Sequence, residues 1–277
     1  MNVENVDRKA SLEILLRALK LPTFARQHEE WARTAVQEGW TFGQYLHNLA
    51  ESEVEERRRR RLDRFLDESE LPREKTLATL DRSRLTPKVQ RQLAVLLTGE
   101  FARQGRNALA FGLPGRGKTH LVCAIGHDLI RQGLRVYFTP AYALVQRLLA
   151  AKRDLRLERE LQSLDRYDVV ILDDIGYVQQ TRDEMDVLFT FLAERYENRS
   201  VMITSNLVFS AWDRIFKDPM TTAAAIDRVV HNAIILEMVG ETQRSPAQDP
   251  GGASAARKPA KPVLADVESV PVAQTPA

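Results

Sequence analysis

The sequence contains a single cysteine, Cys123, in 277 residues. One cysteine excludes an intramolecular disulfide and any metal site built from several cysteines. Long apolar runs are also lacking, since no stretch approaches the roughly 20 apolar residues that a transmembrane helix needs. The first residues, MNVENVDRKA, have no apolar segment behind a basic start, so we expect no secretory signal. From these absences we expect a cytoplasmic protein that makes no use of a membrane.

A large net charge is lacking as well, because the formal net charge is only +2, which alone does not indicate a nucleic-acid ligand. The positive charge is nevertheless concentrated in the segment ESEVEERRRRRLDR, which begins at residue 51. On a helix, the side chains of Arg57, Arg60, Arg61 and Arg64 share one face. Such a face suits contacts with DNA phosphates. It also suits a solvated surface, because glutamates stand four residues before several of the arginines, and both interpretations stay open.

The chain divides into three parts by composition and periodicity. Residues 1–68 predict a small all-α domain, in which Pro22 starts a second helix and a capping box of Thr41 and Gln44 starts a third. Residues 69–244 predict the main domain. Residues 245–277 hold six of the twelve prolines and show no periodicity, so we expect a disordered tail there.

The main domain alternates short apolar runs with longer amphipathic ones. The predicted strands are residues 108–111, 135–139, 168–172, 200–204 and 233–238, and the predicted helices include residues 118–131, 141–152 and 183–198. This alternation predicts an α/β fold with a parallel five-stranded sheet covered by helices on both faces. In such a sheet, ligands bind at the carboxyl ends of the strands.

A P-loop stands at one of these strand ends. It consists of Gly112, Leu113, Pro114, Gly115, Arg116, Gly117, Lys118 and Thr119, and it lies between a predicted strand and a predicted helix, as phosphate binding requires. The glycines let backbone N–H groups surround a phosphate at the positive end of the helix. Lys118 is expected to reach the β- and γ-phosphates of ATP, and the Thr119 hydroxyl to bind Mg²⁺.

Two adjacent acids, Asp173 and Asp174, end the apolar strand about fifty residues after the P-loop. Taken alone, this pair could be a helix cap or a turn. Together with the P-loop it predicts a Walker B segment, in which Asp173 supports Mg²⁺ and Asp174 acts as general base toward the attacking water. Asn206 ends the next strand, where its residue type alone favours an ordinary turn.

Five segments in fixed order resemble the IstB family, the ATP-binding helper proteins encoded beside the transposase of certain insertion sequences. They are GLPGRGKTHL, VVILDDIGY, RYENRSVMITSN, AWDRIFKDP and AAIDRVVHNAIILEMVGETQR, and with LKLPTFARQHEEW the likeness spans about residues 10–244. That family is similar in its core to the helicase loader DnaC and the initiator DnaA. The resemblance therefore implies an AAA+ ATPase domain.

The resemblance also implies roles for individual residues. Asn206 becomes the sensor of the γ-phosphate, and Arg228 matches the arginine finger that reaches the nucleotide of a neighbouring subunit. His120 joins the nucleotide-binding set through the motif GKTHL. Asp174 stands where many AAA+ enzymes have glutamate, so slow catalysis is expected. Arg244 is given no role as a second sensor, because GETQR departs from the usual G-x-S-Y-R ending.

The function expected from this resemblance is an ATPase that assists DNA transposition. With ATP and Mg²⁺ it would form homo-oligomers on duplex DNA and engage the transposase of its element. Two alternatives stay open: a helicase-loader-like ATPase that binds single-stranded DNA, and a non-hydrolysing DNA adaptor.

Overall fold

A computed structural model of the chain describes residues 3–176, 181–207, 212, 219–230 and 233–239, without the side chains of residues 3–10 and 219–222. The expected disordered tail and Arg244 lie outside the described residues. None of the described helices combines the length and the apolar character that crossing a membrane would require.

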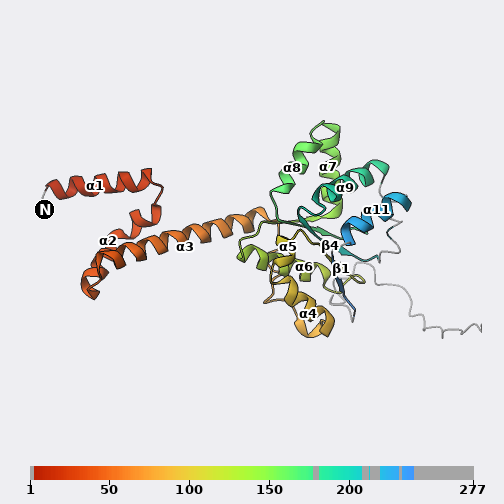
Figure 1. Cartoon of the computed structure of the whole chain (residues 1–277), viewed down its shortest axis with the longest axis horizontal. Helices are drawn as coiled ribbons and strands as arrows, with labels where there is room; N and C mark the ends of the chain where they lie inside the picture. The colour runs from red at the N-terminus through yellow and green to blue at the C-terminus, as the bar shows by residue number, and fades with distance from the viewer. Residues whose placement is uncertain (1–2, 177–180, 208–211, 213–218, 231–232, 240–277) are drawn as a thin grey trace, which may run out of the picture. The chain divides into compact units, whose positions relative to one another are not determined.

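Three helices form the N-terminal part, as the sequence predicts: α1 (Val3–Ala18), α2 (Pro22–Glu38) and α3 (Phe42–Glu68) (Figure 1). Proline at its first turn starts α2, and Gly39, in the left-handed region with φ 66°, ends it. The capping box of α3 is confirmed, because the side chains and backbone N–H groups of Thr41 and Gln44 bond each other reciprocally. The buried carboxylate of Glu53 joins the two longer helices by accepting a hydrogen bond of 2.8 Å from the Thr23 backbone N–H.

The last turns of α3 belong to the hydrophobic core of the main domain. Phe65 and the following Leu71 pack in one core cluster with the P-loop helix and the strands. The backbone N–H of Phe138 donates to the Ser69 carbonyl at 2.7 Å. The boundary between the N-terminal domain (residues 1–68) and the main domain (residues 69–244) stays a prediction. A short connection then leads through η1 (Arg82–Arg84), α4 (Pro87–Leu96) and α5 (Glu100–Arg103) to the sheet.

The predicted parallel five-stranded sheet is confirmed. Its strands are β1 (Ala108–Phe111), β2 (Val136–Pro140), β3 (Val169–Asp173), β4 (Ser200–Ser205) and β5 (Ile234–Glu237), in the spatial order β2-β3-β4-β1-β5. The described helices between them are α6 (Lys118–Arg131), α7 (Ala141–Arg153), α8 (Leu157–Asp165), α9 (Arg182–Arg195) and α11 (Pro219–Val230). Each predicted strand agrees with the structure to within one residue at either end.

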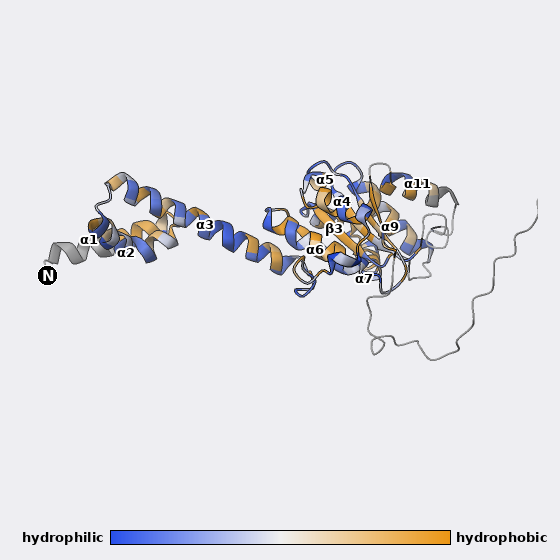
Figure 2. Cartoon of the chain, turned by 90° about the horizontal axis from the view of Figure 1, so that it is seen from below, coloured by the Kyte–Doolittle hydropathy of each residue, from blue (hydrophilic) through white to orange (hydrophobic). Residues whose placement is uncertain are grey.

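Two hydrophobic clusters cover the two faces of the sheet, and the strand residues alternate between them. Leu109 packs with α7, α8, α9 and α11, whereas its neighbours Ala108 and Ala110 pack with α4 and α6. The same alternation in β3 explains why this strand reads as an unbroken apolar run. Hydropathy colouring shows the strands as the most hydrophobic part of the domain (Figure 2). The strand order brings the ends of β1, β3 and β4 together at one carboxyl edge.

The amino edge of the sheet is held by a buried arginine. Arg195, at the end of α9, is 1% exposed, and its guanidinium donates to the carbonyls of Leu164, Tyr167 and Ser200 at 3.0–3.1 Å. Burial lowers the pKa of Arg195 to about 10, so the side chain stays charged at neutral pH. One cation thus links α8, β4 and the segment before β3.

We expect Arg195→Met to lower the free energy of unfolding by about 3 kcal/mol, because buried carbonyls lose their donors. Urea denaturation followed by circular dichroism measures the change. The matched control is Arg199→Met, which removes a half-exposed arginine that pairs with Asp168 at 2.8 Å. The control substitution should lower the free energy of unfolding by less than about 1 kcal/mol. Equal midpoints for the two variants would contradict the structural role of Arg195.

Candidate nucleotide-binding site

The P-loop leaves β1 through a glycine that no other residue can replace without displacing the backbone at Met238, directly after β5. Gly112 has φ 154°, and a Cβ built on it would lie 2.4 Å from the Met238 carbonyl oxygen. Gly117, with φ 81°, stands directly before α6 and turns the chain into that helix. Both glycines therefore serve the geometry of the loop, whose backbone N–H groups lie at the N-terminus of α6, where anions bind.

Lys118 lies inside this loop. Its side chain is 7% exposed, and its ammonium donates to the carbonyls of Gly112 and Leu113 at 2.7 and 3.1 Å. The loop thus holds the positive charge at its centre by hydrogen bonds to its own carbonyls. An incoming phosphate would find this charge already in position.

Asp173 is the centre of a network that joins α6, β3 and β4. The Thr119 hydroxyl lies 2.9 and 3.1 Å from its two carboxylate oxygens, and the Thr204 hydroxyl donates to it at 2.6 Å. The Thr204 oxygen in turn accepts the backbone N–H of Asp174 at 2.8 Å. Sequence reasoning missed Thr204, because β4 also contains Ser200 and Ser205 and nothing in the sequence distinguishes the three hydroxyls.

Asp174 and Asn206 lie beside this network. Asp174 has φ 64°, a left-handed conformation that is rare for residues other than glycine, asparagine and aspartate. The Asn206 side-chain oxygen is buried and finds no hydrogen-bond partner among the described atoms. It approaches the Gly176 backbone so closely that a Cβ there would lie 2.4 Å from it. An unpaired acceptor next to two carboxylates fits a site that takes up a water molecule or a donor group.

These residues fit a magnesium nucleotide. A hydroxyl and a single carboxylate are a donor set typical of Mg²⁺, which usually keeps several waters and binds substrate phosphates. In the described part of the chain, no three His, Cys, Asp or Glu side chains gather to form a complete metal site. The phosphates themselves would therefore have to supply ligands.

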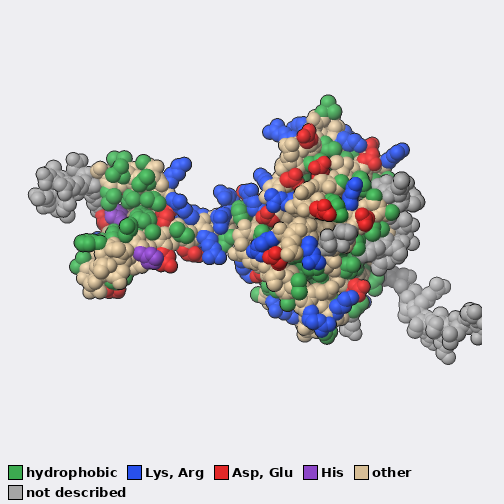
Figure 3. All heavy atoms as spheres, in the orientation of Figure 1, with side chains coloured by type: hydrophobic (Ala, Val, Ile, Leu, Met, Phe, Trp, Pro, Cys, Tyr) green, Lys and Arg blue, Asp and Glu red, His purple; other side chains and the backbone are tan. Residues whose placement is uncertain are grey.

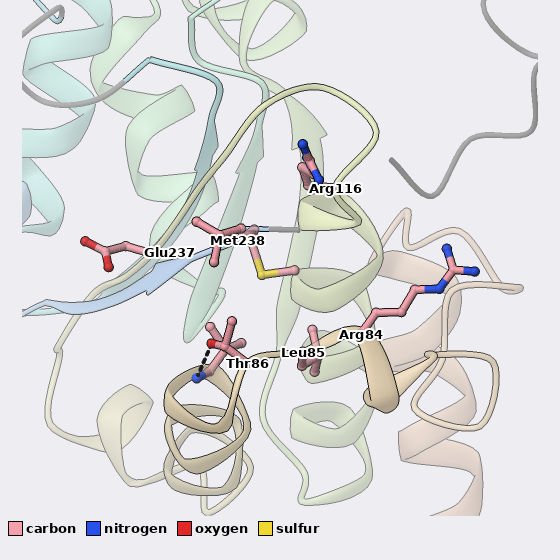
Figure 4. Close-up of a pocket in the computed structure, with 8 residues that line it drawn as sticks. Arg84, Leu85, Thr86, Arg116, Glu237 and Met238 are labelled. Carbon is pink, nitrogen blue, oxygen red and sulfur yellow. Dashed lines mark hydrogen bonds between the residues drawn. The ribbon is translucent and has the colours of Figure 1, made fainter. Parts of the chain in front are cut away.

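A cavity of about 240 Å³ opens beside the P-loop (Figure 4). Its lining comes from the start of α4, from the loop and from the end of β5, and consists of Arg84, Leu85, Thr86, Val89, Arg116, Glu237, Met238 and Val239. The Thr86 hydroxyl caps α4 by accepting the Val89 backbone N–H at 3.3 Å. Except for Arg116, sequence reasoning missed these residues, because they come from segments about 150 residues apart.

Two of the predicted site residues lie away from this group. His120 Nε2 lies 3.2 Å from the Thr76 carbonyl oxygen and 3.1 Å from the Thr79 hydroxyl, so its ring faces the segment before α4. Arg228 lies at the amino edge, where the Asn107 side chain donates to the carbonyls of Arg228 and Val229 at 3.4 and 3.0 Å. The assigned roles of both residues stay predictions.

The arginine face of α3 is partly neutralised. Arg57 pairs with Glu53 at 2.8 Å, and Arg60 pairs with Glu56 at 3.1 Å. Arg61 and Arg64 are exposed and form no ion pair with any residue that the structure describes. Lys and Arg side chains gather over the middle of α3 in the view of Figure 3. Both interpretations of this face stay predictions.

The single cysteine plays no part in this site. Cys123 lies in α6 with none of its surface exposed, and burial raises the pKa of its thiol to about 12. A protonated, enclosed thiol is neither a nucleophile nor a metal ligand.

Comparison with known proteins agrees with this geometry. Residues 14–249 match the family model described as IstB-like ATP binding protein. An insertion sequence ATP-binding protein of Sinorhizobium fredii is 43% identical over 244 residues, which cover 88% of this chain and 82% of that protein. Among solved structures, DnaI is similar with a TM-score of 0.51 at 21% identity, covering 62% of this chain and 96% of that one. The replication initiator DnaA, bound to AMPPCP and single-stranded DNA, gives 0.52 at 15% identity, covering 62% and 52%.

The two structural likenesses show the fold, a P-loop AAA+ domain. The P-loop, the two acids at the end of β3, and the extent of the match to the family model all lead to the same assignment. The chain belongs to the family of IstB-like ATP-binding proteins of insertion sequences.

Proposed function

We propose that the protein is an ATPase that assists DNA transposition by assembling on duplex target DNA and engaging the transposase of its element. The observation that carries the proposal is the network at the carboxyl edge, where Thr119, Asp173 and Asp174 meet beside the buried Lys118. Its relatives are named as ATP-binding proteins of insertion sequences, which supports transposition as the process.

In this proposal ATP binds with its phosphates in the P-loop and its base in the neighbouring cavity. Lys118 would exchange its carbonyl contacts for phosphate oxygens, and Thr119 and Asp173 would hold Mg²⁺. Bound Mg²⁺ would offset the negative charge of the phosphates. The apolar side chains of Leu85, Val89 and Met238 give the cavity surfaces against which a flat base can pack.

Asp174 accepts the proton of the attacking water as general base, and Asn206 orients that water through its unpaired amide oxygen. The Thr204 hydroxyl oxygen accepts the Asp174 backbone N–H at 2.8 Å. This bond fixes the backbone that carries the Asp174 carboxylate. Asp174 is one methylene shorter than glutamate, which supports slow hydrolysis suited to a timing step. Hydrolysis would release the grip on DNA or mark commitment to the target.

Arg228 serves a nucleotide bound by a second copy of the chain. Asn107 bonds the backbone at Arg228 to the amino end of β1, whereas the P-loop leaves the carboxyl end of the same strand. Five residues of extended chain separate the two edges by about 16 Å. The Arg228 guanidinium is therefore badly placed to reach the nucleotide of its own chain. We expect it to reach the nucleotide of a neighbouring copy. This arrangement supports coupling between hydrolysis and assembly.

DNA binding would use the arginine face of α3, made of Arg57, Arg60, Arg61 and Arg64. Of these four, Arg61 and Arg64 are the strongest candidates, because glutamates already neutralise the other two. Contacts with phosphates would give affinity with little sequence preference.

Asp174→Asn is expected to retain ATP binding and to lower hydrolysis by about a hundredfold or more, because the amide cannot accept the proton. Fluorescent-nucleotide titration and single-turnover phosphate release measure the two effects separately. Asp183→Asn, which changes an exposed carboxylate 73% accessible at the start of α9, is the control and should hydrolyse normally. Unchanged hydrolysis in Asp174→Asn would remove the general base from the proposal.

Light scattering and DNA binding with ATP, with ADP and without nucleotide test the function as a whole. We expect large complexes on duplex DNA with ATP only, and their loss in Arg228→Ala. Equal binding in all three states would favour the non-hydrolysing adaptor. A preference for single-stranded DNA would favour the helicase loader.

The double variant Arg61→Ala/Arg64→Ala should weaken duplex binding and reduce the slope of log K against log salt by about 2, if each arginine contacts one phosphate. The matched control is Arg57→Ala/Arg60→Ala, which removes the same charge from the same helix. Equal effects of the two double variants would show that only the overall charge of α3 matters.

A further inference from the structure

The guanidinium of Arg228 rests on an aromatic ring. Its central carbon lies 4.5 Å from the ring centre of Phe189, the shortest such contact among the described residues. Phe189 belongs to α9, is partly buried and packs against the core cluster on that face of the sheet. The ring therefore has a fixed position, and it attracts the cation through the negative charge of its face.

The polar atoms of Arg228 are poorly satisfied in this arrangement. Its NH1 atom is buried and has no hydrogen-bond partner, and no described acid forms an ion pair with the guanidinium. A buried N–H without an acceptor costs free energy, which an added oxygen acceptor would recover. The Arg228 guanidinium thus lacks a hydrogen-bond acceptor in its plane.

An aromatic support differs from a carboxylate in a way that suits a phosphate ligand. A carboxylate would neutralise the cation and occupy its N–H donors. A ring beneath the guanidinium occupies no in-plane donor, so the donors other than the buried Nη1 remain available to oxygen atoms. The backbone is fixed at the same time, because Asn107 bonds the carbonyls of Arg228 and Val229.

We infer that Phe189 is a positioning residue that orients Arg228 toward the phosphate of a nucleotide bound by a second copy of this chain. The inference rests on the proposed function, because it requires Arg228 to act in trans. Phe189 itself touches neither nucleotide nor metal. It restricts the guanidinium to one orientation before the neighbouring copy arrives, which lowers the entropic cost of the contact.

Assemblies mixed from two variants distinguish the copy that supplies Arg228 at an interface from the copy that binds ATP there. A copy with Lys118→Ala contributes Arg228 but binds no ATP, and a copy with Arg228→Ala binds ATP but lacks the arginine. We expect each variant alone to be inactive in DNA-stimulated hydrolysis and the mixture to recover activity. Absence of recovery would overturn the action in trans, and with it this inference.

Phe189→Leu is then added to one chain at a time. In the Lys118→Ala copy it should lower the recovered hydrolysis by about tenfold, within the range of a lost cation–π contact. In the Arg228→Ala copy the same substitution should leave recovery unchanged, and this is the matched control. Phe189→Tyr in the Lys118→Ala copy should restore activity, since it keeps the ring face.

Two results would overturn the role of Phe189 while leaving Arg228 in place. Equal loss of activity from Phe189→Leu in either copy would assign the ring to packing of α9. Full recovery with Phe189→Leu in the Lys118→Ala copy would show that Arg228 needs no support from the ring.

Discussion

The structure depends on the requirement that a carboxylate at the end of a buried strand be paired. Asp173 ends β3 inside the domain, and an unpaired charge there would be costly. The hydroxyls of Thr119 and Thr204 meet this requirement from α6 and β4. The P-loop helix, the acid-bearing strand and the strand of Asn206 are thereby connected through one side chain. The same bonds that stabilise the edge of the sheet also bring the proposed reacting groups together.

The carboxyl edge and the amino edge of the sheet differ in how their polar side chains are bonded. At the carboxyl edge, Lys118 and Asn206 keep polar atoms that a ligand can use. At the amino edge, the terminal guanidinium nitrogens of Arg195 and the side-chain amide of Asn107 donate to backbone carbonyls and fix the ends of strands and helices. Arg228 lies at the same edge, but its guanidinium rests on the Phe189 ring instead of on carbonyls. This difference is what suggests that an acceptor comes from outside the chain.

The sequence was sufficient to predict the strands, the P-loop and the two acids at the end of β3, because each depends on a local pattern of residues. It was insufficient where distant segments meet. The cavity beside the P-loop combines Leu85 with Met238, and no periodicity relates these positions. The inward orientation of the Arg195 guanidinium has no signal in the sequence, because the carbonyls that it bonds lie in separate segments of the chain. His120 follows the P-loop directly, yet the helix turn directs its ring to Thr76.

The enclosed thiol of Cys123 has a practical consequence. With a pKa of about 12 and no exposed surface, it will not react with maleimides under conditions that label an accessible cysteine. The natural chain therefore behaves as a cysteine-free background for spectroscopy. A single cysteine introduced on α3 and another on α9 would accept a pair of fluorophores without further changes. Distances within and between copies of the chain can thus be followed while nucleotide and DNA are added.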